Sequence, residues 1–124
     1  MMEIRPLEHS DDLQAVGQLY VDSWQQTYQR ILPQHFLDRL TPDRWSAVLA
    51  AEPENWLGLF VDETLKGAAM LGFSRDETCE NCGEIVSLYL QPGEEGKGYG
   101  RKLLEGCLAH CREQGCENIC LWVM

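Results

Sequence analysis

Hydrophobic residues recur at intervals of three and four in the first part of the chain, which predicts helices. The longest predicted helix begins at a cap on Ser10 and runs to about Tyr28. Asp11 and Asp12 are expected in its first turn, where negative charge complements the helix dipole. Its buried stripe is predicted to contain Leu13, Val16, Leu19 and Tyr20.

Three shorter elements surround this helix. Residues 3–7 are predicted to form a first strand, and Pro33 is predicted to open a second helix that continues through Leu40. Thr41 and Pro42 have the pattern of an N-cap followed by proline at the first helical position, which predicts a third helix to about residue 51.

From Trp56 onwards the hydrophobic pattern changes to that of strands. A strand at 56–61, a turn at 62–64 and a return strand at 66–73 are predicted, and 75–83 is a polar connection. Gly115 is expected to end a helix spanning about 98–114 in a left-handed conformation. Further strands are predicted at 84–91 and 118–123. Antiparallel strands followed by one strand–helix–strand crossover predict an α/β domain with a mixed, mostly antiparallel sheet flanked by helices.

Length, charge and hydropathy narrow the range of functions. A chain of 124 residues is expected to form a single domain over residues 1–124. The net charge of −10 argues against nucleic-acid binding, which needs clustered Lys and Arg. No segment approaches the ~20 apolar residues of a membrane span, and the first residues lack the features of a signal peptide. We therefore expect a cytoplasmic protein that binds neither membranes nor nucleic acids.

Six cysteines raise the question of a metal or redox site. Cys79 and Cys82 form one CxxC pair in the polar connection, but tetrahedral zinc needs four ligands. Cys107 and Cys111 share a predicted helical face with leucines, so we interpret them as small core residues. No metal site is predicted, and a cysteine-based metal or redox module remains a minor alternative for the function.

A strand, a glycine-rich turn and a helix start follow one another at residues 85–104. Glycines allow an anion to approach the backbone, and the free N–H groups of the first helical turn point towards it. Lys97 is followed by Gly98 and not by Ser or Thr, which excludes a mononucleotide P-loop. Arg101 stands where a dinucleotide fingerprint needs a third small residue. The segment therefore predicts a site for another diphosphate-bearing cofactor.

The segment Glu95-Gly96-Lys97-Gly98-Tyr99-Gly100, after the strand 84–91, resembles the acetyl-CoA motif of the GNAT N-acetyltransferase superfamily. In that motif Gln or Arg, two residues, Gly, any residue and Gly or Ala follow the fourth strand. Glu95 occupies the first motif position, where a carboxylate is unfavourable for a pyrophosphate. Residues 19–37 also resemble the first two helices of small members.

This resemblance implies a set of functional residues. Glu84 would be the general base for a primary amine acceptor, which is a small molecule or a peptide. Trp24 and Tyr28 would border the acceptor pocket. The co-substrate would be acetyl-CoA. The strand backbone at Leu88, Tyr89 and Leu90 would pair with its pantetheine arm, and one N–H of this strand would polarise the thioester carbonyl. The turn would hold the pyrophosphate; its residues are Glu95, Gly96, Lys97, Gly98, Tyr99, Gly100 and Arg101.

The end of the sequence adds a further expectation. Members of the superfamily usually continue with another helix and two strands, whereas this sequence stops at Met124. An apolar terminal strand with an open edge favours association, so we expect a homodimer through residues 117–124. A catalytically inactive acetyl-CoA-binding fragment is the principal alternative to an active acetyltransferase.

Overall fold

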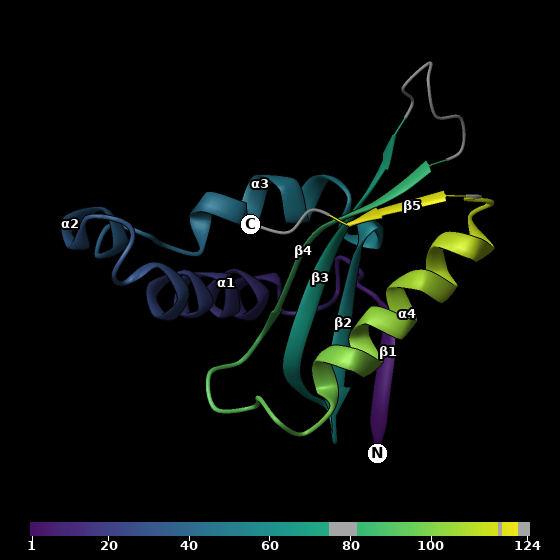
Figure 1. The fold of residues 1–124 in the computed structure, drawn as a ribbon, viewed down its shortest axis with the longest axis horizontal. Coiled ribbons are helices and arrows are strands. Elements are labelled where there is room, and N and C mark those ends of the chain that lie inside the picture. Colours follow the sequence, from purple (N-terminus) through teal and green to yellow (C-terminus); the bar gives the residue numbers. More distant parts are fainter. Residues whose placement is uncertain (75–81, 117, 122–124) are drawn as a thin grey trace.

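The computed structural model describes residues 1–74, 82–116 and 118–121. A five-stranded sheet with the strand order β1-β2-β3-β4-β5 forms its centre (Figure 1). Neighbouring strands from β1 to β4 are antiparallel, and β4 and β5 are parallel. The elements in chain order are β1 (Met2–Pro6), α1 (Leu13–Tyr28), α2 (Gln34–Leu37), α3 (Asp43–Ala51), the 3-10 turn η1 (Pro53–Asn55), β2 (Trp56–Val61), β3 (Thr64–Ser74), β4 (Cys82–Leu90), α4 (Tyr99–Glu113) and β5 (Asn118–Leu121).

The sheet has a hydrophobic cluster on each face. Helix α4 covers one face, where Leu103, Cys107 and Cys111 pack against alternate residues of β2, β3 and β4. Helices α1 and α3 cover the other face, where Tyr20 and Leu49 are buried. Figure 1 shows α4 separated from α1 and α3 by the strands. This arrangement confirms the predicted mixed sheet, and within the described residues no helix has the length and hydropathy to cross a membrane.

The start of α1 differs from its prediction. The N-cap is Asp12, whose carboxylate accepts a hydrogen bond from the Ala15 N–H at 3.1 Å, and the helix begins at Leu13. The prediction that Ser10 caps the helix, with both aspartates in its first turn, was therefore wrong. Asp11 instead accepts two hydrogen bonds from Arg5 and one from the Glu8 N–H, which holds residues 8–11 in a turn.

Three further boundaries move for local reasons. Helix α2 ends at Leu37, three residues before its predicted end, and α3 begins at Asp43 with Pro42 at its N-cap. No side-chain cap is made there, so the predicted capping role of Thr41 was wrong; its carbonyl accepts a hydrogen bond from the Arg44 N–H. Strand β3 begins at Thr64, because the hairpin turn needs only the residues 62 and 63.

The later elements agree closely with prediction. Gly115 has a φ of +83° immediately after the end of α4, as expected for a left-handed terminating glycine. Strand β5 is described only to Leu121, and the CxxC prediction involving Cys79 lies outside the described residues. The same holds for much of the segment 117–124 that was predicted to form a dimer contact.

Gly17 is the closest point of contact between α1 and the chain that enters α3. A Cβ at this position would lie 2.9 Å from both the Cβ and the carbonyl oxygen of Pro42, and 3.0 Å from its Cα. Backbone atoms cannot move away cheaply, so a side chain here forces the helix outward. The absence of a side chain at Gly17 therefore sets the distance between these helices.

We expect Gly17→Ala to lower the free energy of unfolding by up to about 2 kcal/mol. Overpacking typically costs about 1–3 kcal/mol, and the better helix propensity of alanine offsets about 1 kcal/mol of this. Urea unfolding of the purified chain measures the change. Gly100→Ala is the matched control in α4, because its Cβ would meet only Cδ1 of Leu90 at an ordinary contact distance of 3.7 Å. Equal or greater stability of Gly17→Ala relative to this control would contradict the expectation.

Candidate active site

Within the described residues, strand β4 is paired along its length on one side but only in its first half on the other. Its antiparallel partner β3 reaches from Ser74 to Gly67, opposite Cys82 to Leu90. Its parallel partner β5 pairs only with residues 82–85. The described part of the chain therefore places no strand beside residues 86–90 on the β5 side, and in Figure 1 β4 continues beyond the end of β5.

The register determines which β4 backbone groups face this open edge. The Gln91 N–H donates to the Lys66 carbonyl at 2.8 Å, so residue 91 turns its backbone towards β3. Backbone direction alternates along an antiparallel strand, so Tyr89 also bonds towards β3 while Leu88 and Leu90 face away from it. The Leu90 carbonyl accepts a hydrogen bond from the Ser23 hydroxyl at 3.2 Å. Of the three strand residues predicted to bind the cofactor, the register directs the backbone of Leu88 and Leu90 to the open edge.

A β-bulge separates the two halves of β4. Met70 pairs with Ser87 but Leu71 pairs with Ile85, which leaves Val86 as the extra residue. Bulges reorient side chains and increase the local twist of a strand. The bulge lies where pairing with β5 ends, so it coincides with the beginning of the open edge.

The glycine-rich turn after β4 leads directly into α4. Gly93, Gly96 and Gly98 have φ values of +89°, +83° and +82°, a region that side-chain-bearing residues rarely adopt. A Cβ on any of these glycines would meet no atom within 4 Å, so the space beside them is open. Gly98 is the N-cap of α4 and makes no side-chain cap. The amides of Tyr99, Gly100 and Arg101, in the first turn, therefore have the geometry of a helix N-terminal anion site.

Charged side chains around the turn are paired with one another. The Glu94 carboxylate accepts hydrogen bonds from Lys66 at 3.1 Å and from Lys97 at 2.9 Å. The Lys97 ammonium, followed by that of Lys66, lowers the pKa of Glu94, and Glu94 in turn raises the pKa of Lys97. Glu95 accepts a hydrogen bond from the Gly93 N–H at 3.0 Å, and Arg101 is 85 % exposed beside Glu105. The carboxylate of Glu95 thus supports the turn itself.

Aromatic residues connect α1 with β4 on the face of the sheet that α4 does not cover. The rings of Trp24 and Tyr28 lie 4.9 Å apart, and those of Tyr20 and Tyr89 are also 4.9 Å apart. Burial, followed by the neighbouring Tyr28, raises the pKa of Tyr89 to about 12. The structure therefore brings the two predicted acceptor-site residues next to a side chain of the predicted cofactor strand.

A buried hydrogen bond fixes this contact. The Tyr20 hydroxyl and Ser87 Oγ are 2.6 Å apart, and Tyr20 is 2 % exposed. Burial raises the pKa of Tyr20 well above its usual range. Sequence analysis assigned Tyr20 to the core and did not single out Ser87, because nothing local in the sequence indicates a partner 67 residues away.

Glu84 is half-buried on the same face of β4 as Ser87. Ile85, its neighbour, packs under α4, so alternation directs Glu84 to the α1 side. A Cβ on Gly72 would lie 3.6 Å from Glu84 Oε2, so the carboxylate lies over a residue without a side chain. Four residues of strand separate Glu84 from Leu88, about 13 Å at ~3.3 Å per residue.

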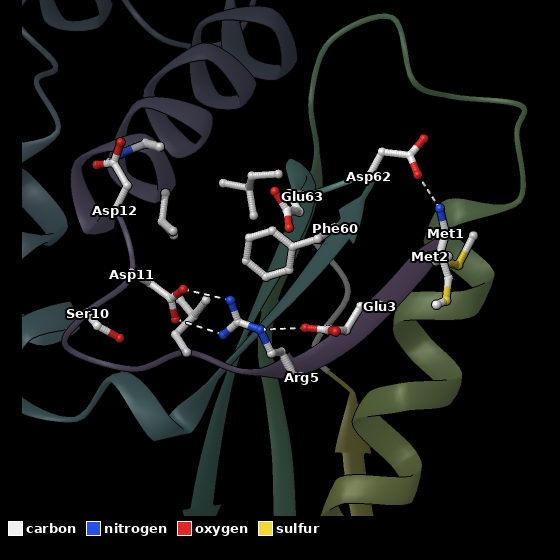
Figure 2. Close-up of a pocket in the computed structure, with 14 residues that line it drawn as sticks. Met1, Met2, Glu3, Arg5, Ser10, Asp11, Asp12, Phe60, Asp62 and Glu63 are labelled. Atoms are coloured by element: carbon white, nitrogen blue, oxygen red, sulfur yellow. Dashed lines mark hydrogen bonds and ion pairs between the residues drawn. The ribbon is translucent and has the colours of Figure 1, made fainter.

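A separate cavity of about 970 Å³ lies at the β1 edge of the sheet, away from this site (Figure 2). Arg5 crosses its wall between Asp11 and Glu3, with its guanidinium 4.5 Å from the centre of the Phe60 ring. The Arg5 guanidinium lowers the pKa of Asp11. Sequence analysis missed this cavity, since its acidic residues were assigned to a helix start and a turn. Asp11 is committed to an internal pair, so its charge stabilises the cavity wall.

Similarity to known proteins agrees with this geometry. The model of the acetyltransferase (GNAT) family matches residues 13–124. The uncharacterized N-acetyltransferase YuaI of Bacillus subtilis is 28% identical over 122 residues, covering 92% of this chain and 67% of that protein. The crystal structure of PaiA N-acetyltransferase from Thermoplasma acidophilum with coenzyme A has a TM-score of 0.83 and 26% identity, covering 99% of this chain and 79% of that one. The crystal structure of a GNAT family acetyltransferase from Brucella melitensis with acetyl-CoA has a TM-score of 0.73 and 19% identity, covering 100% of this chain and 77% of that one.

The chain belongs to the GNAT acetyltransferase family. The predictions of the superfamily, of its fold and of an acetyl-CoA-dependent N-acetyltransferase class are thereby confirmed. The described residues include no group of three or more His, Cys, Asp or Glu placed to hold a metal ion. The individual roles predicted for Glu84, Trp24, Tyr28 and the turn stay predictions.

We expect Ser87→Ala to lower the free energy of unfolding by about 1–3 kcal/mol, because it leaves the buried Tyr20 hydroxyl without this partner. Tyr20→Phe removes that hydroxyl itself and should cost less, about 0.5–1.5 kcal/mol. Urea unfolding of both variants and of the double variant measures the coupling. The double variant should recover part of the Ser87→Ala loss; strictly additive losses would show that the hydroxyls are independent.

Proposed function

We propose that this member of the GNAT family transfers an acetyl group from acetyl-CoA directly to a primary amine. The observation that carries the proposal is the edge of β4 at Leu88 and Leu90, beside which the described residues place no strand, together with the amides in the first turn of α4 that follow it. Such an arrangement suits a long, thin ligand that has an amide-bearing arm and a diphosphate. Coenzyme A in the Thermoplasma relative and acetyl-CoA in the Brucella structure have this chemistry.

The diphosphate end is proposed to bind at the glycine-rich turn. The amides of Tyr99, Gly100 and Arg101 would donate to phosphate oxygens, and the helix dipole would add about half a positive charge. The open space beside Gly96 and Gly98 allows close approach to the backbone. The amide of Lys97 would join them, while its ammonium stays with Glu94. Glu95 is expected to influence the site through the turn conformation.

The arm that carries the thioester is proposed to lie along the open edge of β4. The backbone groups of Leu88 and Leu90 would pair with its amides, and one N–H would polarise the thioester carbonyl. Oxyanion donors of this kind contribute roughly 2.7–4 kcal/mol where one has been removed from an enzyme. Tyr89 would contribute through its side chain, which faces Tyr20 and the α1 aromatics.

Glu84 is proposed to accept a proton from the acceptor amine, through water. An amine with a pKa near ~10.4 is almost entirely protonated at pH 7, so a base raises the fraction of the reactive neutral form. The acceptor would enter on the α1 face, between Glu84 and the aromatic pair Trp24 and Tyr28. The aromatic walls and the carboxylate together favour a cationic amine on an apolar carrier. We propose further that the acceptor is a small molecule or a peptide, and that the chain is a single domain that forms a homodimer in the cytoplasm.

Calorimetric titration of acetyl-CoA into the purified chain tests the cofactor site. We expect saturable micromolar binding that Gly98→Glu abolishes, because the new carboxylate would project beside the phosphate-binding amides. Gly115→Glu is the matched control: its φ of +83° imposes the same strain at the other end of α4. Binding that Gly98→Glu leaves intact, or that Gly115→Glu also abolishes in a folded protein, would contradict the assignment.

Kinetics with a panel of primary amines test the role of Glu84. We expect Glu84→Gln to lower kcat roughly 10²–10⁴-fold while leaving the Kd for acetyl-CoA unchanged. The deficit should narrow as the pH rises towards the pKa of the amine, because the acceptor then loses its proton without help. Glu113→Gln, at an exposed site in α4, serves as the control. A deficit that is constant across pH would assign Glu84 a structural role.

A further inference from the structure

The C-terminal end of α4 folds back on itself and brings two cysteines together. The Cys116 N–H donates to the Cys111 carbonyl at 2.9 Å, and the Gly115 N–H donates to the Arg112 carbonyl at 3.0 Å. These bonds, with the left-handed Gly115, form a Schellman motif. In this motif the residue after the glycine contacts the residue five positions before it, which here places Cys116 against Cys111.

Gly83 of β4 shows how close the two sulfur atoms are. A Cβ on Gly83 would lie 2.9 Å from Cys111 Sγ and 3.1 Å from Cys116 Sγ, so the sulfurs are at most 6.0 Å apart. Burial raises the pKa of Cys111, and the neighbouring Cys116 raises it further. The missing side chain of Gly83 therefore provides the space that both sulfurs occupy.

We propose that Cys111 and Cys116 are a peroxide-oxidisable dithiol that forms an intramolecular disulfide. Cys116 is half-buried while Cys111 is fully buried, so Cys116 is the first of the two to react with peroxide. Its thiolate takes one oxygen of a hydroperoxide; the O–O bond breaks and a sulfenic acid forms. The Cys111 thiolate then attacks that sulfur and displaces hydroxide. With hydrogen peroxide, two thiols are oxidised by two electrons in total, and two molecules of water leave.

The site is distinct from the acetyltransferase site. Helix α4 has 15 residues, so its C-terminal end lies about 22 Å from the glycine-rich turn. The disulfide would tie the residue that leads into β5 to the end of α4, beside Gly83, which pairs with Ile119. Oxidation therefore acts on the parallel β4–β5 pairing and leaves the amides of the turn unchanged.

Peptide mapping of the reduced full chain, treated with stoichiometric hydrogen peroxide and then alkylated, tests the proposal. Trypsin cleaves after Lys102 and Arg112 and so separates residues 103–112 from residues 113–124. We expect these two peptides to be disulfide-linked in the folded protein, with two fewer alkylated thiols. The linkage should form faster as the pH rises, because deprotonation of the buried Cys111 limits the second step.

Single variants identify the bond, because each peptide contains a second cysteine. Cys107→Ala and Cys120→Ser should retain the link, whereas Cys111→Ala and Cys116→Ser should lose it. If Cys111→Ala fails to fold, Cys116→Ser decides alone, since its site is partly exposed. Separate peptides after peroxide treatment of the folded wild type, or a link that persists in Cys116→Ser, would overturn the proposal.

Discussion

The site depends on one constraint: among the residues that the structure describes, the second half of β4 has a strand neighbour on one side only. Backbone N–H and C=O groups in a protein interior need partners, and an unpaired strand edge provides a row of them without one. Ser23 satisfies one such group, the Leu90 carbonyl, from α1. The remaining backbone groups of Leu88 and Leu90 at this edge are positioned to hydrogen-bond a ligand that lies beside β4 as a further strand would. The direction of each backbone amide therefore determines binding at this edge more than the side chains do.

The bulge and the glycine turn extend this constraint in both directions. At the start, the bulge at Val86 follows the last described pair between β4 and β5, and Ser87 just after it contacts Tyr20. At the end, Gly98 turns the chain into α4, so the strand edge continues as the amides of a helix start. The ligand-facing groups thus belong to two regular elements, and their positions are held by sheet and helix hydrogen bonds on either side of the turn.

Much of this could be predicted from the sequence, because it depends on local patterns. Short apolar runs predicted β2 and β4, and the glycines predicted the turn and the start of α4. The rest depends on distant residues. Asp12 became the cap because Arg5 binds Asp11, and the register that separates Leu88 and Leu90 from Tyr89 comes from pairing with β3. A single sequence has no signal for a bulge at Val86, or for the space that Gly72 leaves beside Glu84.

Net charge is a poor guide to this site because local geometry controls its electrostatics. The chain has a net charge of −10. The groups that face the proposed phosphates are nevertheless backbone N–H groups at the start of α4, which carry no negative charge. The Lys66–Glu94–Lys97 cluster combines one carboxylate with two ammonium groups, so it contributes a net positive charge beside the turn. Within a Debye length of about 8 Å at physiological salt, these nearby groups outweigh the acidic surface beyond. An acidic chain can therefore offer an anion site.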